Sequence, residues 1–440
     1  MSALTFKRGI HPNESKHLTE HKAINTILPT GDLVYPMVQH IGAPCKPIVA
    51  KGDYVFAGQK IGEAQGFISS PIHSSVSGIV KNVTEVLHPN GFKCEAVIVE
   101  NDEKYAVLDS IVQRTNVESL SKEEIIEIVK EAGIVGMGGA GFPTYVKLSP
   151  PADKKIDHII LNGAECEPFI TSDHRIMLEE TDKIILGLQL ILKIFPEAKG
   201  YIGIEDNKPD AIKVLQDATK DIDNIEVSVV KSKYPQGAEK QLIYSITKRE
   251  VPSGGLPADV GCIVQNIDTV VAIWRAVYEG MPLVRRVVTV SGGAIKDPQN
   301  FQVKLGVSYR ELIEAAGGFT EEPAKVISGG PMMGFAMYSI DAPVIKGTSS
   351  ILCLTKNEVS VEEEKNCIRC GKCATYCPMN LQPIELNKYS LVGETENFEK
   401  YRGMDCIECG ACSYVCPSKR HLLQSIRTGK KAVLANRKKS

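Results

Sequence analysis

Two cysteine runs near the C-terminus constrain this chain more than any other feature. Each run contains four cysteines followed by a proline: Cys367, Cys370, Cys373 and Cys377 before Pro378, and Cys406, Cys409, Cys412 and Cys416 before Pro417. Both runs have the spacing C-x2-C-x2-C-x3-C-P, which bacterial iron–sulfur proteins use to hold a pair of [4Fe-4S] clusters. The repeat therefore predicts a small two-cluster domain at residues 358–428.

The spacing also predicts which cysteines share a cluster. Three thiolates two residues apart wrap one loop around a cube, and the fourth leads into a helix directed at the other cube. We therefore expect two crossed ligand sets: Cys367, Cys370, Cys373 and Cys416 on one cluster, and Cys377, Cys406, Cys409 and Cys412 on the other.

Other uses of these cysteines explain the pattern less well. Zinc takes four ligands, and pairs of the C-x2-C type serve it, but the third and fourth cysteines of each run would then have no purpose. Disulfides are not expected, because the N-terminus has no signal-peptide pattern and the chain is expected in a reducing compartment. The scattered cysteines read as small buried side chains: Cys45, Cys94, Cys166, Cys262 and Cys353.

Length and composition indicate that the two cysteine runs occupy one domain of a multidomain chain. A chain of 440 residues is expected to form several domains. The net charge of −2 gives no indication of a nucleic-acid partner. No apolar run approaches the roughly 20 residues of a membrane-spanning helix. We therefore expect a chain without a transmembrane segment that can still dock on a membrane complex, with a solvated, frayed basic tail at 429–440.

The N-terminal part predicts strands. Residues 1–41 read as an extended arm, and residues 42–115 read as short strands joined by glycine turns. The stretches 55–62 and 71–80 resemble half of a lipoyl- or biotinyl-type barrel-sandwich. Carriers of that type present a modified lysine at a hairpin tip, but the corresponding tip, 67–71, contains no lysine. A structural or docking role is therefore expected for this unit.

The pattern changes to alternating helices and strands over residues 116–283, which indicates an α/β layered domain. Ser121 and Glu124 predict a capping box for a helix over 123–132. Strands are expected at 156–161, 201–204 and 225–230, and helices at 173–195, 209–218, 237–247 and 267–278. Residues 284–340 predict a small α+β module that resembles the soluble-ligand-binding β-grasp unit, and 345–354 is expected to link it to the cluster domain.

A glycine-rich loop supplies the second chemical signal. Gly136, Gly138, Gly139 and Gly141 precede Phe142, and Lys147 follows. Glycines let a backbone approach a phosphate closely, and their N–H groups can form an anion nest. A helix precedes the loop rather than a strand, so it is not a Rossmann fingerprint. The alternative for this motif taken alone is a flexible loop.

Polar residues at the ends of later strands favour a binding site over a flexible loop. Asn162, Glu165 and Glu167 follow the first strand of the α/β unit, Glu239 follows a later strand, and Asn266 opens a helix. Ligands of α/β sheets bind at the carboxyl ends of the strands. These residues are therefore expected to share one binding site with the glycine loop.

Together these motifs resemble the flavin- and NADH-binding subunit of respiratory complex I. The residues that match its motifs are Gly136, Gly138, Gly139, Gly141, Phe142, Lys147, Asn162, Glu165, Glu167, Glu239 and Asn266. The sequence departs from the pattern at Ala164, Ala238 and Gln265. The resemblance implies non-covalent FMN beneath NADH, with Phe142 stacked on the nucleotide and Glu167 in contact with it. It also implies that Lys147 neutralises phosphate or flavin charge.

Over its full length the chain resembles the RnfC family. The segments that follow Cys377 and Cys416 are especially similar to that family. The resemblance implies a barrel-sandwich, a complex-I-type flavin α/β domain, a β-grasp module and a helical, ferredoxin-like domain with two [4Fe-4S] clusters. It implies a peripheral subunit on the cytoplasmic face of the bacterial membrane, in an ion-translocating ferredoxin:NAD oxidoreductase. Partners would be the other subunits, including an iron–sulfur ferredoxin-like one.

Electron chemistry favours the same assignment. Nicotinamide moves two electrons as hydride, a cube moves one, and a flavin can convert between the two. Two alternatives stay open at this point. One is a flavin-dependent cobalamin reductase of bacterial microcompartments, which resembles RnfC along its length. The other is a non-catalytic ferredoxin-like carrier whose α/β part only docks partners.

Overall fold

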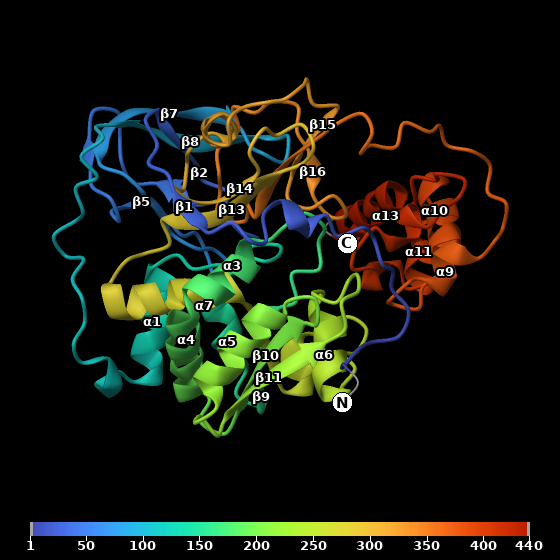
Figure 1. Ribbon diagram of the computed structural model, residues 1–440, viewed down its shortest axis with the longest axis horizontal. Coiled ribbons are helices and arrows are strands. Elements are labelled where there is room, and N and C mark those ends of the chain that lie inside the picture. Colours follow the sequence, from blue (N-terminus) through green and yellow to red (C-terminus); the bar gives the residue numbers. More distant parts are fainter. Residues whose placement is uncertain (1–2, 438–440) are drawn as a thin grey trace.

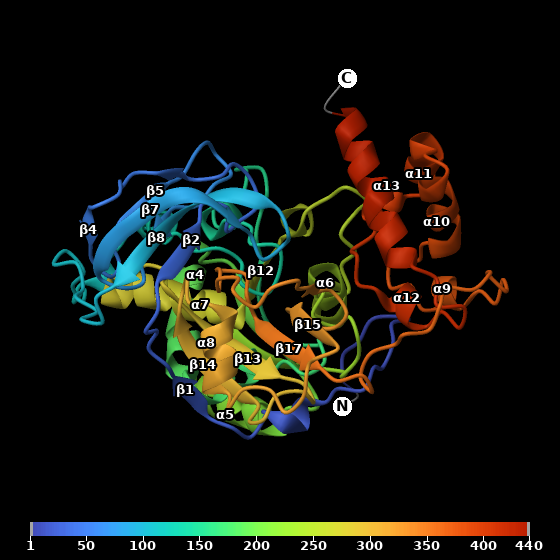
Figure 2. The same cartoon turned by 90° about the horizontal axis from the view of Figure 1, so that it is seen from above.

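The computed structural model describes residues 3–437 and divides them into four packed units. In Figure 1 the strands of the N-terminal unit and of the β-grasp unit lie above the α/β unit, and the helices of the cysteine runs lie to one side. Figure 2 shows the helical unit, labelled α9 to α13, to one side of the three larger units. The helical unit therefore meets the rest of the chain along one edge.

The α/β unit is built on a parallel sheet of four strands in the order β11-β10-β9-β12. The strands are β9 (His158–Gly163), β10 (Lys199–Glu205), β11 (Ile225–Val230) and β12 (Cys262–Asn266). Side chains alternate between the two faces of a strand. Ile159 and Leu161 of β9 accordingly enter the main apolar core, while Ile160 enters a second core on the other face.

Helices cover both faces of this sheet. They are α1 (Lys122–Glu131), α2 (Thr144–Lys147), α3 (Ser172–Glu179), α4 (Thr181–Ile194), α5 (Pro209–Thr219), α6 (Glu239–Thr247) and α7 (Ile267–Trp274). The capping box of α1 is confirmed, since Ser121 and Glu124 exchange both hydrogen bonds. The single helix expected over 173–195 is wrong. The chain breaks at Glu180, whose carboxylate pairs with Arg275 at 2.9 Å and Arg285 at 3.1 Å.

The N-terminal unit packs two small antiparallel sheets, β2-β8-β7-β4 and β3-β5-β6. Its strands are β2 (Leu33–Pro36), β3 (Lys46–Pro47), β4 (Tyr54–Val55), β5 (Lys60–Glu63), β6 (Ile72–His73), β7 (Gly78–Leu87) and β8 (Lys93–Asn101). The expected arm at 1–41 is therefore too long. Leu33 and Tyr35 of β2 are buried in the core of the sandwich, because they provide the inward side of a strand paired with β8.

The β-grasp unit forms a sheet of six strands in the order β1-β14-β13-β17-β15-β16, crossed by α8 (Tyr309–Ala315). Its strands are β1 (Ile24–Thr26), β13 (Arg285–Ser291), β14 (Gln299–Lys304), β15 (Lys325–Ser328), β16 (Phe335–Ala336) and β17 (Ser350–Leu354). The expected link at 345–354 is wrong, because β17 is a fully buried strand between β13 and β15. The strand partners of β17 lie elsewhere in the chain, so its neighbours in sequence did not indicate its place in the sheet.

The helical unit contains α9 (Lys372–Thr375), α10 (Pro383–Leu391), α11 (Thr395–Lys400), α12 (Ala411–Tyr414) and α13 (Leu422–Arg437). The expectation of a frayed tail from 429 is wrong as far as residue 437. Val433 is buried, and a Cβ added at Gly429 would lie 2.6 Å from the ring of Phe398. The basic residues lie on a packed helix that continues the unit; 438–440 lie outside the described residues.

The N-terminal segment before β1 ties two units together. Leu4 pairs with Val230 at the end of β11, and the backbone of Ile10 exchanges two hydrogen bonds of 2.8 Å with Tyr234. Between them, Arg8 donates to the carbonyl of Ala374 at 2.7 Å, three residues before the last cysteine of the first run. No helix of the described residues is long and apolar enough to cross a bilayer.

Candidate functional site

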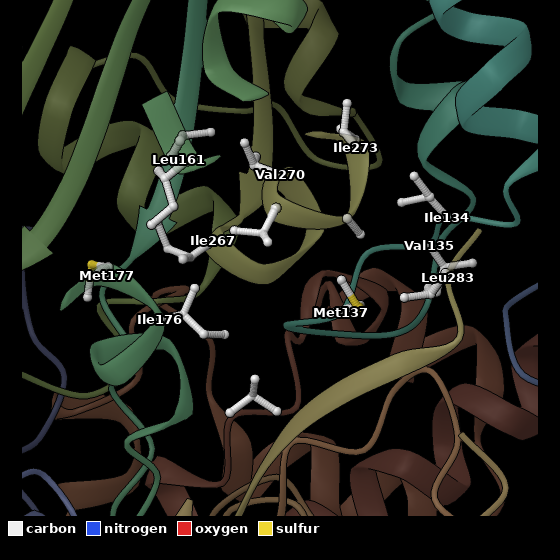
Figure 3. Close-up of a cluster of buried hydrophobic side chains, with 14 of the residues drawn as sticks. Ile134, Val135, Met137, Leu161, Ile176, Met177, Ile267, Val270, Ile273 and Leu283 are labelled. Carbon is white, nitrogen blue, oxygen red and sulfur yellow. The ribbon is translucent and has the colours of Figure 1, made fainter. Parts of the chain in front are cut away.

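The glycine loop connects α1 and α2 and is closed at its base. Gly136 donates to the carbonyl of Phe142 at 2.9 Å, and the amide of Met137 donates to the hydroxyl of Thr269 at 3.0 Å. Figure 3 shows the Met137 side chain among the labelled apolar residues of the main core. Gly141 has φ +70°, a conformation that favours glycine. The core thus anchors the base of the loop.

The tip of the loop is open. Gly138, Gly139 and Ala140 are exposed, and their amides donate to no other group in the part of the chain that the structure describes. A Cβ on Gly139 would meet nothing within 4 Å, whereas one on Gly138 would lie 2.9 Å from the Asn266 amide nitrogen. Consecutive free amides on a glycine backbone form a site for an anion such as a phosphate.

The polar strand ends lie beside this loop. Asn162 donates from its amide to the carbonyl of Gly237 at 2.8 Å and accepts from the amide of Ala164. Asn266 caps α7 through its side-chain oxygen and donates to Asp173 at 2.6 Å. Since β9 and β12 are parallel neighbours, their carboxyl ends bring Asn162 and Asn266 to one edge.

Acidic residues on the same edge have distinct environments. Glu165 accepts from the amides of Asp173 and His174, at 2.7 and 3.3 Å, and so stabilises the start of α3. Burial and the neighbouring carboxylates of Glu165 and Asp268 raise the pKa of Asp173. Glu165 therefore shapes the edge, and Asp173 is a further ionisable group that the sequence motifs do not include.

Lys147 lies at the end of α2 and forms an ion pair of 2.7 Å with Glu239 at the start of α6. Both side chains are half-buried. Lys147 also donates to the carbonyl of Val264 in β12 at 3.1 Å. These contacts of Lys147 join α2, which follows the glycine loop, to α6 and β12. The ammonium of Lys147 stays accessible to an anionic group.

Glu167 lies where the α/β, β-grasp and helical units meet. One carboxylate oxygen accepts from the amide of Met332 at 3.1 Å, and the other lies 3.4 Å from the hydroxyl of Tyr234. Burial is the main cause that raises the pKa of Glu167, to about 7. This carboxyl can therefore change its charge near neutral pH.

The structure brings most of the expected side chains together. Contacts join Gly138 to Asn266, Lys147 to Glu239, and Asn162 to the turn before α6. Phe142 contributes its carbonyl to the base of the loop, and its side chain is half-buried. Cys166, expected to be simply buried, is half-buried and accepts from the amide of Gly237 at 3.2 Å.

The expected site residues included neither Lys16 nor Tyr234. Lys16 is buried, and its ammonium donates to the carbonyls of Glu165, Glu167 and Ile170 at 2.9, 3.0 and 2.6 Å. It holds the turn after β9 in place from a distant segment. The motif Y-x-x-G of the complex I subunit, present here as Tyr234 to Gly237, was the one signal that pointed to Tyr234.

The second cysteine run forms a protected cavity. Cys377, Cys406, Cys409 and Cys412 line it together with apolar residues that include Met379, Leu381, Leu386, Ile407, Leu423 and Ile426. Burial raises the pKa of Cys406 to about 11, and Cys377 is among the neighbouring thiols that add to this rise. Cys377 therefore lies with the second run, as crossed ligation requires.

The first run is more open. Cys367 and Cys370 are exposed, and Cys373 and Cys416 are half-buried. Burial raises the pKa of Cys373, and the nearby thiols of Cys416 and Cys367 contribute to the shift. This neighbourhood fits the other crossed set. Thiols must lose their protons to bind iron, so cluster assembly here would release protons.

The two sets of four cysteines suit [4Fe-4S] clusters better than single metal ions. Among residues 3–437, no three Cys, His, Asp or Glu side chains converge closely enough to hold one metal ion. In a [4Fe-4S] cube each thiolate binds a different iron, so the four sulfurs stand farther apart than around one zinc. The apolar lining of the second-run cavity and its four thiols fit such a group.

Four family models match successive parts of the chain. They are the RnfC barrel-sandwich hybrid domain at residues 4–104, the Nuo51 FMN-binding domain at 129–275, the SLBB domain at 287–336 and the 4Fe-4S dicluster domain at 366–420. These matches confirm the expected fold class.

Three relatives match almost the whole chain. It is 51% identical over 428 residues to the C subunit of a proton-translocating ferredoxin:NAD(+) oxidoreductase complex from Clostridium ljungdahlii, covering 96% of this chain and 93% of the relative. It is 48% identical over 435 residues to the C subunit of the Na(+)-translocating complex from Acetobacterium woodii, covering 99% and 98%. The C subunit of an ion-translocating oxidoreductase complex from Rhodobacter capsulatus is 40% identical, covering 91% and 78%.

Among solved structures, an NAD+-reducing [NiFe]-hydrogenase in its air-oxidized state is similar, with a TM-score of 0.50 and 18% identity. The match covers 76% of this chain and 67% of that one. At this identity the likeness concerns the fold alone.

Proposed function

Because the chain belongs to the RnfC family of ferredoxin:NAD+ oxidoreductase complexes, we propose that it passes electrons between NAD(H), FMN and two [4Fe-4S] clusters on the NADH side of such a complex. FMN accepts hydride from the nicotinamide and releases electrons singly, and each cube carries one electron. Its partners are the other subunits of the ion-translocating complex.

One observation supports this function above the others. Cys409 of the second run packs in the same apolar cluster as Tyr234 and Cys166 of the strand-end edge. The expected flavin site and the second-run cluster are therefore neighbours. The first run is the more exposed of the two, since Cys367 and Cys370 are exposed. We infer the order flavin site, second-run cluster, first-run cluster, and an iron–sulfur ferredoxin-like partner at the exposed run.

In this proposal different residues of the chain bind the FMN phosphate, the nucleotide base and the ribose. The free amides of Gly138, Gly139 and Ala140 hold the FMN phosphate, and Lys147 balances negative charge on the same side. Phe142 stacks on the nucleotide base. Glu167 accepts hydrogen bonds from ribose hydroxyls, so the site prefers NADH to NADPH, whose 2′-phosphate it would repel.

The supporting residues hold these groups in place. Asn162 and Asn266 fix the strand ends, Glu165 fixes the start of α3, and Glu239 orients Lys147. The absence of a spanning helix among the described residues fits a peripheral subunit. We assign the subunit to the cytoplasmic face of the membrane, where NADH is available.

The glycine loop allows a direct test. A Cβ on Gly139 meets nothing within 4 Å, so Gly139→Val leaves the ligand-free fold intact and fills only the space above the loop. We expect at least about 100-fold weaker FMN binding, measured by flavin fluorescence during reconstitution. Gly347→Val is the matched control, because a Cβ there also meets nothing within 4 Å. Equal FMN affinity in both variants would remove the loop from the flavin site.

A further inference from the structure

We propose that Tyr234 is the positioning residue that holds the second cysteine run against the strand-end edge of the α/β unit and so sets electron transfer from the flavin to the second-run cluster. This inference rests on the proposed function, because the two groups that Tyr234 joins are the expected flavin site and the nearest expected cluster. No motif of the cysteine runs or of the glycine loop includes this residue.

The contacts of the phenol carry the inference. Tyr234 is 1% exposed, and its hydroxyl donates to the carbonyl of Cys409 at 2.7 Å. The nearer oxygen of Glu167 lies 3.4 Å from the same hydroxyl. The phenol has one proton, which the shorter contact assigns to Cys409. Tyr234 is thus a direct side-chain link from the turn between β11 and α6 to the backbone of Cys409, an expected cluster ligand.

The phenol is a fixed donor. The backbone of Tyr234 exchanges two hydrogen bonds of 2.8 Å with Ile10, so the N-terminal segment fixes the position of its backbone. The loop that receives the bond is also constrained. Gly410, next to Cys409, has φ +76°, and a Cβ there would lie 2.9 Å from the carbonyl of Met332. Because the Tyr234 hydroxyl and the Cys409 carbonyl are both held in place, their hydrogen bond fixes the spacing between the α/β unit and the helical unit.

The bond has an electrostatic consequence. The hydroxyl proton faces the Cys409 carbonyl and offsets the negative end of its dipole. Without this proton the carbonyl would present more negative potential to a cluster held by Cys409, which would disfavour the added electron. Removing the hydroxyl therefore lowers the reduction potential of the second-run cluster. A purely structural hydrogen bond predicts a change in stability with no change in that potential.

The step that the residue influences is simple. In the loaded protein one electron would pass from reduced flavin to a cluster held by Cys377, Cys406, Cys409 and Cys412, with no bond formed or broken. The two electrons of one NADH require two such transfers. Tyr234 takes no part as a redox group in this scheme; it fixes the distance and the local potential.

The test compares Tyr234→Phe with Tyr234→Leu in the full chain, prepared anaerobically with both clusters and FMN. Both variants lack the hydroxyl and differ in shape, so an effect common to both belongs to the hydroxyl. Tyr309→Phe is the matched control, because Tyr309 is 0% exposed and its hydroxyl bonds Ser328 at 2.7 Å within the β-grasp unit. Iron and flavin content, a mediated EPR redox titration and stopped-flow absorbance are measured for each.

We expect both Tyr234 variants to lower the potential of the second-run cluster and to slow its reduction by flavin about tenfold, the effect of losing one hydrogen bond. Reduction of the flavin by NADH should keep its normal rate, and the control should match the parent chain. Loss of the second-run cluster from both Tyr234 variants, with flavin retained, would show a purely structural bond and would overturn the proposed effect on the potential. Unchanged potential and unchanged cluster reduction would overturn it.

Failure of the proposed function gives a different result. If NADH does not reduce the flavin of the parent chain, the fault lies in the nucleotide assignment rather than in Tyr234. The chemical redox titration uses no NADH, so it still reports whether the hydroxyl sets the cluster potential. Equal potentials in parent and variants there would exclude the inference by itself.

Discussion

At the scale of single residues, Glu167 gives the site a pH dependence. Burial raises its pKa to about 7, so the carboxyl is neutral below that pH and ionised above it. Only the ionised form accepts hydrogen bonds from ribose hydroxyls on both oxygens. NADH binding should therefore strengthen as pH rises through 7, and weaken up to about tenfold for each pH unit below it.

The measurement is the NADH concentration that gives half the maximal rate of flavin reduction in anaerobic stopped-flow, between pH 5.5 and 8.5. Glu167→Gln has nearly the same shape but cannot ionise in this range, so its profile should be flat. A parent profile as flat as that of the variant would show that Glu167 does not contact the nucleotide in its charged form.

Local spacing predicted the residues whose partners are close in sequence. The cysteine ligands, the glycines and the capping box all depend on separations of a few residues. Tyr234 and Lys16 act across 175 and 149 residues, on Cys409 and Glu165 respectively, and no periodic pattern encodes such a contact. A buried lysine also reads from sequence as an exposed charge, because lysines are rarely buried without partners.

At the scale of elements, the same limit explains the corrected segments. The strand β17 and the helix α13 are defined by what packs on them: two strand neighbours for the first, and the Phe398 ring against Gly429 for the second. Three of the four strands of the α/β sheet were predicted, because each is a short apolar run between turn signals. The strand β12 was not predicted. The bounds of 225–230 agree with β11.

The N-terminal segment is the element whose role is easiest to test. It contacts the helical unit through Arg8 and Gly9, and the α/β unit through Ile10. Removing residues 1–10 should loosen the loop around residues 371–377, while FMN affinity stays within about twofold because the glycine loop is untouched.

Hydrogen–deuterium exchange of the reconstituted protein measures this effect. We expect exchange over 371–377 to rise about tenfold or more, with strand β14 as an internal reference that does not change. Protection that stays constant in both regions would mean that the segment does not brace the helical unit.

At the scale of the whole molecule, the proposed entry point of electrons, the nucleotide site, and their proposed exit point, the first cysteine run, lie in different units. The residues proposed to bind nucleotide and flavin lie at the carboxyl edge of the parallel sheet. Cys409 of the second-run cavity packs with Tyr234 and Cys166 of that edge, and the thiols of Cys367 and Cys370 in the first run are exposed. The sequence supplied the parts of this route through its motifs. Their order in space depends on how four units pack, which no single motif determines.

The most direct test of this order is anaerobic stopped-flow reduction of the purified holoprotein by NADH, followed by freeze-quench EPR. We predict that flavin absorbance falls first, that cluster signals follow, and that Cys377→Ser keeps flavin reduction but loses the second-run cluster and with it rapid reduction of the first. Cluster reduction that outpaces the flavin, or a Cys377→Ser protein that loses only the first-run cluster, would contradict this order.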